Sequence, residues 1–291
     1  MTTELPDLSS DPRLADLVRR ALEEDLGAGD CTSEALIGAA ETAEAVILAR
    51  GSYVVAGLPV AEEVFRQVDA GLECRMRTRD GDPVERGQGV LVLQGRARSI
   101  LAGERVALNF LQRLSGIATL TRQFARKAAP YGVQILDTRK TTPTLRFLEK
   151  YAVLCGGGAN HRIGLYDRVL IKDNHRAAWV RRSGRGLAGA VEEARRRFPD
   201  LVIEIEVESE EELRDALTAR PDWVLLDNMA PDRLARCAAL AKGLCHVEAS
   251  GGVTLDTVEA IARSGVDAVS VGALTHSAPA ADFSLEFAIG A

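Results

Sequence analysis

The chain has 291 residues, a formal net charge of −6, 46% hydrophobic residues and only 4% aromatic residues. Its length allows one large α/β barrel, alone or with a smaller companion domain, and a core of Ala, Val, Leu and Ile is typical of helices packed on parallel strands. The sequence has no basic run suited to coating nucleic acid and no apolar stretch of membrane-spanning length. Residues 1–10 are polar, so we expect neither a signal peptide nor an anchor.

The cysteines indicate the redox state of the compartment in which the protein is expected. They are scattered, odd in number and without metal-ligand spacing, so we expect reduced core thiols in a cytoplasmic protein. They are Cys31, Cys74, Cys155, Cys237 and Cys245.

Residues 1–128 are predicted to form a small α+β domain that ends in a long connecting helix. Asp11–Leu26 carries apolar side chains at helical spacing, and a second helical stretch lies near Ala61–Val68. Short β-like runs are separated by turns such as Asp80-Gly-Asp-Pro83. From Ile100 to Ala128 a helical pattern follows, in which we expect Ser115-Gly116 to bend or end the helix, because Gly is a poor helix residue. The β-like runs are Ala45–Ala49, Tyr53–Ala56, Leu72–Met76 and Val90–Leu93.

Residues 129–291 repeat a pattern of strand, loop and helix. This alternation predicts parallel strands with crossover helices, and closure of such a sheet gives a (β/α) barrel. Fewer than eight good strands are present, so we predict an α/β fold with an irregular, incomplete (β/α) barrel, whose C-terminal tail could pack back on the N-terminal α+β domain. The candidate strands are Val133–Leu136, Val169–Ile171, Val202–Val207, Trp223–Leu226, His246–Ala249 and Ala268–Val271. The helical patterns between the later strands are Glu211–Thr218, Asp232–Ala241 and Leu255–Ser264.

Charged or glycine-rich residues follow all six candidate strands. In a barrel the carboxyl ends of the strands share one face, where active sites are normally built. A polar residue after a single strand would mark only the start of a loop, but six in succession favour a functional site. The segments are Asp137-Thr-Arg-Lys140, Lys172-Asp-Asn-His175, Glu206 with Glu208, Asp227-Asn228, Ser250-Gly-Gly252 and Gly272.

The chemistry of these residues suits an anionic substrate and a phosphorylated, metal-bound co-substrate. Arginine can hold a carboxylate through two parallel hydrogen bonds. Glu206 and Asp227 are carboxylates suited to a hard cation such as Mg²⁺. The glycines of Ser250-Gly-Gly252 and Val271-Gly-Ala273 let backbone N–H groups approach a phosphate. The candidate cations are Arg105, Arg139, Lys140, His161, Arg162 and Lys172.

Several long motifs resemble those of the quinolinate phosphoribosyltransferase family. The resemblance runs from about residue 20 to the C-terminus, and the central motifs are long and unusual, so they are far more specific than a short glycine pattern. The central motifs are Asp137-Thr-Arg-Lys-Thr-Thr-Pro143, Glu149-Lys-Tyr-Ala-Val153, Cys155-Gly-Gly-Gly158, Asn160-His-Arg162 and Leu170-Ile-Lys-Asp-Asn-His175. The flanking motifs include Glu24-Asp-Leu-Gly27, Glu104-Arg-Val-Ala-Leu-Asn-Phe110, Leu225-Leu-Asp-Asn228, Ser250-Gly-Gly252 and Val271-Gly-Ala-Leu-Thr-His276.

The resemblance implies phosphoribosyl transfer from phosphoribosyl pyrophosphate to quinolinate (pyridine-2,3-dicarboxylate) with decarboxylation. The products would be nicotinate mononucleotide, pyrophosphate and CO₂, as in de novo NAD biosynthesis. It also implies a homodimer, in which the N-terminal domain of one subunit covers the barrel mouth of the other and Arg105 reaches the active site there.

The resemblance assigns roles to the site residues of this sequence. Lys140, Lys172, Glu206 and Asp227 would act in catalysis, the two carboxylates holding the ribose hydroxyls or Mg²⁺. The residues that would bind the dicarboxylate and phosphate groups are Arg105, Thr138, Arg139, Lys140, His161, Arg162 and Lys172. Those that would bind the 5′-phosphate are Ser250, Gly251, Gly252, Val271, Gly272 and Ala273, with His276 as a weaker candidate.

Three positions depart from the family pattern. Thr144 follows Pro143 where Gly is common, Leu154 stands where a basic residue is common, and Arg168 replaces a small or apolar residue. Arg168 and Lys172 could share a strand face about 13 Å apart, so we expect Arg168 to make a phosphate contact or a subunit salt bridge rather than to disturb the chemistry.

Other polar residues have ordinary structural interpretations. Glu204 and Glu206 share one strand face, and the spacing to Asp227 favours Glu206 as the ligand. Glu208 is expected to be exposed or to lie behind the ligands. We expect His175 to cap or orient the Lys172 loop, and His246, inside a strand, to belong to the core.

Two other functions stay open on the sequence. A lysine at a barrel strand end, here Lys172, is the usual nucleophile of Schiff-base aldolases, although the flanking arginines argue against it because a polyanion site needs Lys172 charged. The second open function is that of a ligand-binding or transport-associated relative without this activity, as in the molybdenum-linked homologues of the same fold. Intact Thr141-Thr142, Asn160-His161 and Lys172-Asp-Asn174 favour the enzyme.

Overall fold

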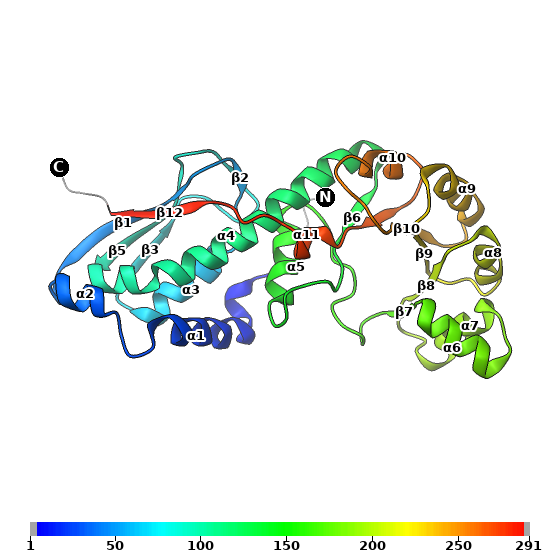
Figure 1. The fold of residues 1–291 in the computed structure, drawn as a ribbon, viewed down its shortest axis with the longest axis horizontal. Helices are drawn as coiled ribbons and strands as arrows, with labels where there is room; N and C mark the ends of the chain where they lie inside the picture. The colour runs from blue at the N-terminus through cyan, green and yellow to red at the C-terminus, as the bar shows by residue number, and fades with distance from the viewer. Residues whose placement is uncertain (1–4, 288–291) are drawn as a thin grey trace. The chain divides into compact units, whose positions relative to one another are not determined.

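The computed structural model describes residues 5–287 as two compact units (Figure 1). The first contains the chain up to Arg122, residues 148–157 and the segment from Ala278 onwards; the second contains residues 123–147 and 158–277. Residues 1–4 and 288–291, which belong to the predicted domains 1–128 and 129–291, lie outside the described part. None of the described helices is long and apolar enough to span a membrane.

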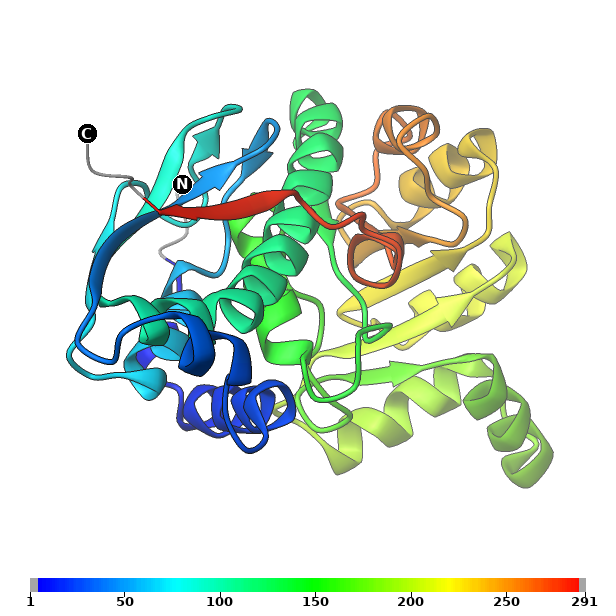
Figure 2. The same ribbon diagram turned by 60° about the vertical axis from the view of Figure 1, so that its left-hand side comes forward.

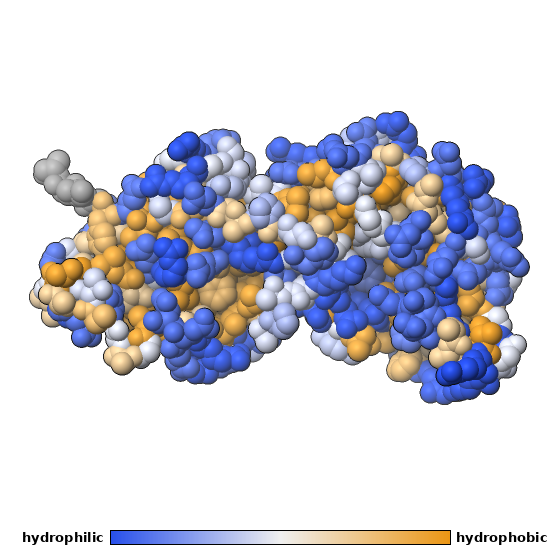
Figure 3. Space-filling model, viewed as in Figure 1, coloured by the Kyte–Doolittle hydropathy of each residue, from blue (hydrophilic) through white to orange (hydrophobic). Residues whose placement is uncertain are grey.

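The first unit is an α+β fold built on an antiparallel sheet of strand order β12-β1-β5-β3. Its strands are β1 (Thr42–Ala49), β3 (Glu73–Met76), β5 (Gly89–Arg96) and β12 (Phe283–Phe287), and β2 (Tyr53–Val54) pairs separately with β4 (Pro83–Val84). Its shorter helices are α1 (Pro12–Leu26), α2 (Cys31–Leu36) and α3 (Leu58–Val68). Helix α1 begins where the Asp11 carboxylate accepts the backbone N–H of Arg13. On the side that Figure 3 shows, hydrophobic residues interrupt the hydrophilic surface of this unit around α2 and β1.

The long helix α4 (Ala97–Ala128) runs through Ser115-Gly116, so the prediction that the helix could end there is wrong. The pair serves packing instead. The Ser115 hydroxyl accepts the backbone N–H of Ala56 at 3.0 Å. A Cβ on Gly116 would lie 2.1 Å from the carbonyl oxygen of Pro279, so only Gly lets the C-terminal segment approach the helix this closely. The helix α5 (Arg146–Cys155) follows further along the chain.

The second unit is an open parallel sheet of order β6-β11-β10-β9-β8-β7. Its strands are β6 (Gln134–Leu136), β7 (Val169–Ile171), β8 (Ile203–Val207), β9 (Trp223–Asp227), β10 (His246–Ser250) and β11 (Ala268–Ser270). Helices between the strands lie along one side of the sheet (Figures 1 and 2). They are α6 (Asp173–Ser183), α7 (Leu187–Arg197), α8 (Glu210–Thr218), α9 (Pro231–Ala241) and α10 (Val258–Ala262), and the short helix α11 (Ala273–His276) follows the last strand, β11.

This sheet confirms the predicted incomplete (β/α) barrel. All six candidate strands form, and within residues 5–287 no ladder joins β6 to β7. Instead, Leu136 of β6 makes an isolated parallel bridge to Ala159 in the loop before β7. The carboxyl ends of all six strands therefore open on the same edge of one sheet.

Two smaller predictions need correction. His246 is not a core residue: it opens β10 with a side chain that is 64% exposed, and its ring stacks on Trp223 with centroids 4.8 Å apart. All five cysteines are free, but only Cys155 and Cys237 are buried, and Cys31 is exposed. A first strand residue and a short helix start carry no burial signal of their own, which explains both errors.

Candidate active site

Two adjoining pockets open at the carboxyl ends of the strands of the second unit. Every predicted site residue except Arg105 lines one of them. The first pocket, of about 440 Å³, is lined by Thr138, Arg139, Lys140, His161, Arg162, Leu170, Lys172, Asp173, Glu206, Leu225, Asp227, Glu248, Ser250 and Ser270. The second, of about 460 Å³, is lined by Thr138, Lys140, Asp227, Asn228, Ser250, Gly251, Gly252, Val253, Thr254, Ser270, Val271, Gly272, Ala273 and His276.

Two arginines lie close together in the first pocket. Arg162 is buried, and its pKa is lowered first by burial and then by the nearby charge of Arg139. The Nε of Arg139 is buried and finds no hydrogen-bond partner among the described residues. Two neighbouring guanidinium groups, one with an unpaired buried donor, form a site that an anion would stabilise.

Lysines border the same pocket from two loops. Lys172 follows β7 directly and precedes α6, and its backbone N–H donates to Nδ1 of His175 at 3.1 Å. This contact confirms that His175 orients the Lys172 loop. Lys140 is exposed, and its main chain is held at both sides, since its N–H donates to Oγ1 of Thr138 and its carbonyl accepts from Oγ1 of Thr275 at 2.7 Å.

Two carboxylates stand where the pockets meet the strand ends. Glu206 of β8 is half-buried, and its pKa is raised first by burial and then by the charge of Asp227 at the end of β9. The charge of Lys172 lowers the pKa of the same carboxyl group. A pair of oxygen donors that repel each other in a partly buried setting fits a hard divalent cation. Glu208 is exposed and forms an ion pair with Arg176 at 3.2 Å, as expected for a residue outside the ligand set.

The second pocket is walled by glycine-containing turns. Gly251 has φ of +97°, and a Cβ there would lie 2.1 Å from Oδ1 of Asn228, so the turn after β10 requires Gly. Within the described chain, four backbone N–H groups in these turns donate to no other group. Such N–H groups are the donors that bind phosphate in backbone cradles. They belong to Gly251, Gly252, Gly272 and Ala273.

The loop that carries Arg139 and Lys140 contains a strained turn. The N–H of Leu145 donates to the carbonyl of Thr142 at 3.1 Å, with Pro143 at the second position and Thr144, at φ of +71°, at the third. This is the pattern of a type II turn, whose third position favours Gly. Thr144 is thus a β-branched residue in the left-handed region.

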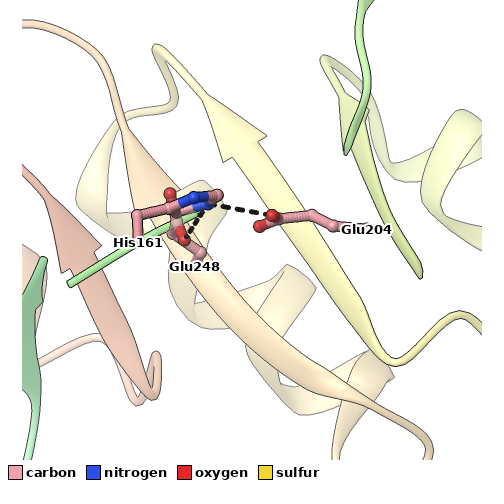
Figure 4. A group of neighbouring side chains, drawn as sticks. All are labelled: His161, Glu204 and Glu248. Atoms are coloured by element: carbon pink, nitrogen blue, oxygen red, sulfur yellow. Dashed lines mark hydrogen bonds and ion pairs between the residues drawn. The ribbon is translucent and has the colours of Figure 1, made fainter. Parts of the chain in front are cut away.

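A buried polar cluster, whose members the sequence analysis did not bring together, meets the first pocket at His161 and Glu248. Nε2 of His161 lies 2.9 Å from Oε2 of Glu204 and 3.4 Å from Oε2 of Glu248, and all three residues are buried (Figure 4). Burial and the charge of Glu204 raise the pKa of Glu248 well above its ordinary value. Glu248 alternates with Val247 and Ala249 in its strand, as Glu204 does with its neighbours, and this alternation was the available signal.

Two predicted site residues, His161 and Arg105, are placed differently from the other predicted site residues. Both ring nitrogens of His161 are engaged within the chain, because Nδ1 accepts the backbone N–H of Arg162 at 2.7 Å while Nε2 faces Glu204. Arg105 is an exposed residue of α4 in the first unit and lines neither pocket.

Residues 30–115 match the family model of the quinolinate phosphoribosyl transferase N-terminal domain, and residues 117–286 match that of the C-terminal domain. A probable nicotinate-nucleotide pyrophosphorylase (carboxylating) from Bacillus subtilis is 42% identical over 275 residues, covering 94% of this chain and 93% of that protein. A mitochondrial quinolinate phosphoribosyltransferase (decarboxylating) 2b from Nicotiana tabacum is 40% identical, covering 94% and 82%.

Solved structures give the same result over almost the full length. NadC from Streptococcus pyogenes matches with a TM-score of 0.90 and 37% identity, covering 98% of this chain and 99% of that one. The nicotinate-nucleotide pyrophosphorylase from Francisella tularensis matches with a TM-score of 0.89 and 36% identity, covering 98% and 100%. The chain belongs to the quinolinate phosphoribosyltransferase family.

Proposed function

We propose that the chain transfers the phosphoribosyl group of phosphoribosyl pyrophosphate to quinolinate and decarboxylates the adduct. The products are nicotinate mononucleotide, pyrophosphate and CO₂, and the relatives from Bacillus and Nicotiana carry names of this activity. The observation that carries the proposal is the pair of adjoining pockets, one cationic and one lined by free backbone N–H groups, which share Lys140, Asp227 and Ser250. Such a pair suits a dicarboxylate beside a phosphorylated sugar.

The first pocket would hold quinolinate. Arg139 lies close enough for its charge to act on Arg162, and Lys172 borders the same space. A dianion would neutralise more of this charge than a monoanion, and bidentate contacts with arginine would fix the orientation of the pyridine ring. His161, with both nitrogens engaged, would line the floor rather than carry the main charge.

The second pocket would hold the 5′-phosphate. The free N–H groups of Gly251, Gly252, Gly272 and Ala273 would donate to the phosphate oxygens. His276 borders this pocket and would contribute at its edge. The ribose would then extend toward Glu206 and Asp227, which line the first pocket.

Glu206 and Asp227 fit Mg²⁺, because both offer carboxylate oxygens and the pKa of Glu206 is raised by burial and by the charge of Asp227. When bound there, Mg²⁺ would neutralise negative charge on the pyrophosphate of the co-substrate. The same carboxylates could instead accept hydrogen bonds from the ribose hydroxyls.

Positioning of the two substrates and fixed charges in the pockets would supply most of the rate enhancement. The pyridine nitrogen attacks the anomeric carbon as the bond to pyrophosphate breaks, and Glu206 and Asp227 stabilise the positive charge that develops on the ribose. Lys140 and Lys172 are placed to counter negative charge on the substrates. In the adduct the ring nitrogen is cationic, so it accepts the electron pair released when the C–CO₂ bond breaks, and a proton takes the place of CO₂. No general base is needed.

We further propose a cytoplasmic homodimer with shared active sites. Arg105 is exposed on α4 and makes no ion pair within residues 5–287. In the second unit, the loop after Arg162 exposes Ile163, Leu165 and Tyr166, which is unusual for so many apolar side chains in one loop. A second copy could cover this loop and bring its own Arg105 to the first pocket. Five free cysteines suit a reducing compartment.

One assay tests the proposed function. The purified chain should form nicotinate mononucleotide and CO₂ from quinolinate and phosphoribosyl pyrophosphate with Mg²⁺. Absence of product, with both substrates shown to bind, would favour a ligand-binding relative. Release of an aldehyde or ketone from a substrate captured at Lys172 would favour the Schiff-base lyase.

A further inference from the structure

The side chain of Arg168 turns inward instead of toward solvent. The side chain is only 13% exposed, and one guanidinium nitrogen lies 3.3 Å from Oε2 of Glu204. The guanidinium carbon also lies 5.0 Å from the ring centre of Trp223, within the range of a cation–π contact. Arg168 therefore has its closest charged and aromatic partners, Glu204 and Trp223, within its own chain.

The guanidinium supplies the positive charge that the buried cluster requires. Glu204 and Glu248 are completely buried, and a buried carboxylate without a partner is strongly destabilising. His161, Glu204 and Glu248 bring three ligand-type atoms within 4.8 Å of one another, which could suit a metal ion. However, the same Arg168 nitrogen lies 3.3 Å from Nε2 of His161 and 3.3 Å from Glu204, so a cation already occupies this neighbourhood.

A chain of contacts leads from Arg168 to the substrate pocket. Oε2 of Glu204 faces both Arg168 and Nε2 of His161, at 3.3 Å and 2.9 Å. Since Nδ1 of His161 accepts the backbone N–H of Arg162, the ring donates from Nε2 to Glu204 and its tautomer is fixed. In addition, the Arg162 guanidinium donates to the carbonyl oxygen of Arg168 at 3.2 Å. Arg162 is thus held at its main chain and at its side chain.

The loop between the two arginines is closed by its own contacts. The Asp167 carboxylate accepts the backbone N–H groups of Ile163 and Gly164 at 2.7 Å and 2.8 Å. These contacts close the loop that joins Arg162 to Arg168.

We infer that Arg168 is a positioning residue for dicarboxylate binding, which fixes Arg162 through Glu204 and His161. This inference rests on the proposed function, because it assigns Arg162 to the quinolinate site. Arg168 would not touch quinolinate. Its charge would hold Glu204 in place, Glu204 would hold the His161 ring, and the ring would hold the main chain of Arg162.

The test compares the steady-state constants of Arg168→Met and Arg168→Lys with the unchanged chain. Arg168→Met keeps an apolar side chain against Trp223 but removes the charge. We expect it to raise KM for quinolinate about tenfold, the scale of coupling between contacting residues, and to leave KM for phosphoribosyl pyrophosphate within about twofold. Arg168→Lys keeps the charge and should raise KM for quinolinate only about threefold. A general structural defect would raise both KM values together.

Arg195→Met is the matched control. Arg195 also forms an ion pair in the second unit, with Asp222 at 2.8 Å, but it contacts none of His161, Glu204 and Arg162. It should leave both KM values unchanged. If Arg168→Met does not fold, Arg168→Lys provides the test alone. The inference is overturned if Arg168→Lys leaves KM for quinolinate unchanged, or if it raises KM for quinolinate and KM for phosphoribosyl pyrophosphate equally.

The two proposals fail separately. An unchanged chain that forms no product from quinolinate and phosphoribosyl pyrophosphate refutes the proposed function. In that case calorimetric binding of phthalate, a non-reacting dicarboxylate, still tests Arg168, because the inference requires weaker binding by Arg168→Met than by Arg195→Met. An active unchanged chain with an equally active Arg168→Met refutes the inference alone.

Discussion

Replacing Thr144 by Gly should stabilise the chain, because the residue occupies a backbone conformation that its side chain opposes. Thr144 has φ of +71° in the turn closed by Leu145 N–H and the Thr142 carbonyl, and it is exposed. An L-residue in the left-handed region costs about 1–2 kcal/mol. Glycine removes this cost but adds about 0.5–1 kcal/mol of backbone entropy lost on folding. The net gain is about 0.75 kcal/mol, or roughly 1–2 °C in the unfolding midpoint for a chain of this size.

Differential scanning calorimetry of a substitution series measures this gain. Thr144→Ala is the matched control, because alanine keeps the Cβ and should gain clearly less than glycine. Thr144→Asn should fall between the two, since asparagine tolerates the left-handed region better than most residues. The reasoning is refuted if Thr144→Gly unfolds at the same temperature as Thr144→Ala or below it.

Three further predictions concern the active site. Mixed dimers of Arg105→Ala and Lys172→Ala subunits, each nearly inactive alone, should regain one working site of two; if activity never returns on mixing, Arg105 does not act on the other subunit. Asp227→Asn should weaken the Mg²⁺-dependent use of phosphoribosyl pyrophosphate and leave quinolinate binding largely intact, whereas an unchanged Mg²⁺ dependence in both Asp227→Asn and Glu206→Gln would remove these residues from the metal site. Borohydride with substrate should leave no adduct on Lys172, and a trapped adduct detected by mass spectrometry would support the Schiff-base lyase.

The strands were predictable because their signal is local. Short runs of apolar, β-branched residues bounded by polar loops mark β7 to β11, and the predicted Val169–Ile171 coincides with β7. Helix α6, by contrast, was not predicted. None of its residues is buried, so it lacks the apolar stripe that reveals a surface helix.

Features that depend on distant partners were not predictable. Gly116 is required by the approach of the Pro279 carbonyl, which lies far along the chain. The inward turn of Arg168 depends on Glu204 in the next strand and on Trp223 in the strand after it. In the same way, the sequence motifs indicated which residues carry the chemistry, but not that both nitrogens of His161 are engaged inside the chain.

The central claim is that the first pocket selects a dicarboxylate, and substrate selectivity tests it most directly. Arg139, Arg162 and Lys172 line one pocket of about 440 Å³, a cluster that a single carboxylate would neutralise only in part. Loss of one bidentate, partly desolvated carboxylate contact costs about 2–5 kcal/mol, or roughly thirty-fold to several-thousand-fold in kcat/KM.

The measurement is kcat/KM for quinolinate and for nicotinate, side by side, with phthalate as an inhibitor. Nicotinate lacks the 2-carboxylate and should be worse than quinolinate by at least about thirty-fold. Phthalate keeps both carboxylates but lacks the ring nitrogen, so it should bind competitively with quinolinate and not react. Equal kcat/KM values for nicotinate and quinolinate would contradict the dicarboxylate pocket and the function assigned to it.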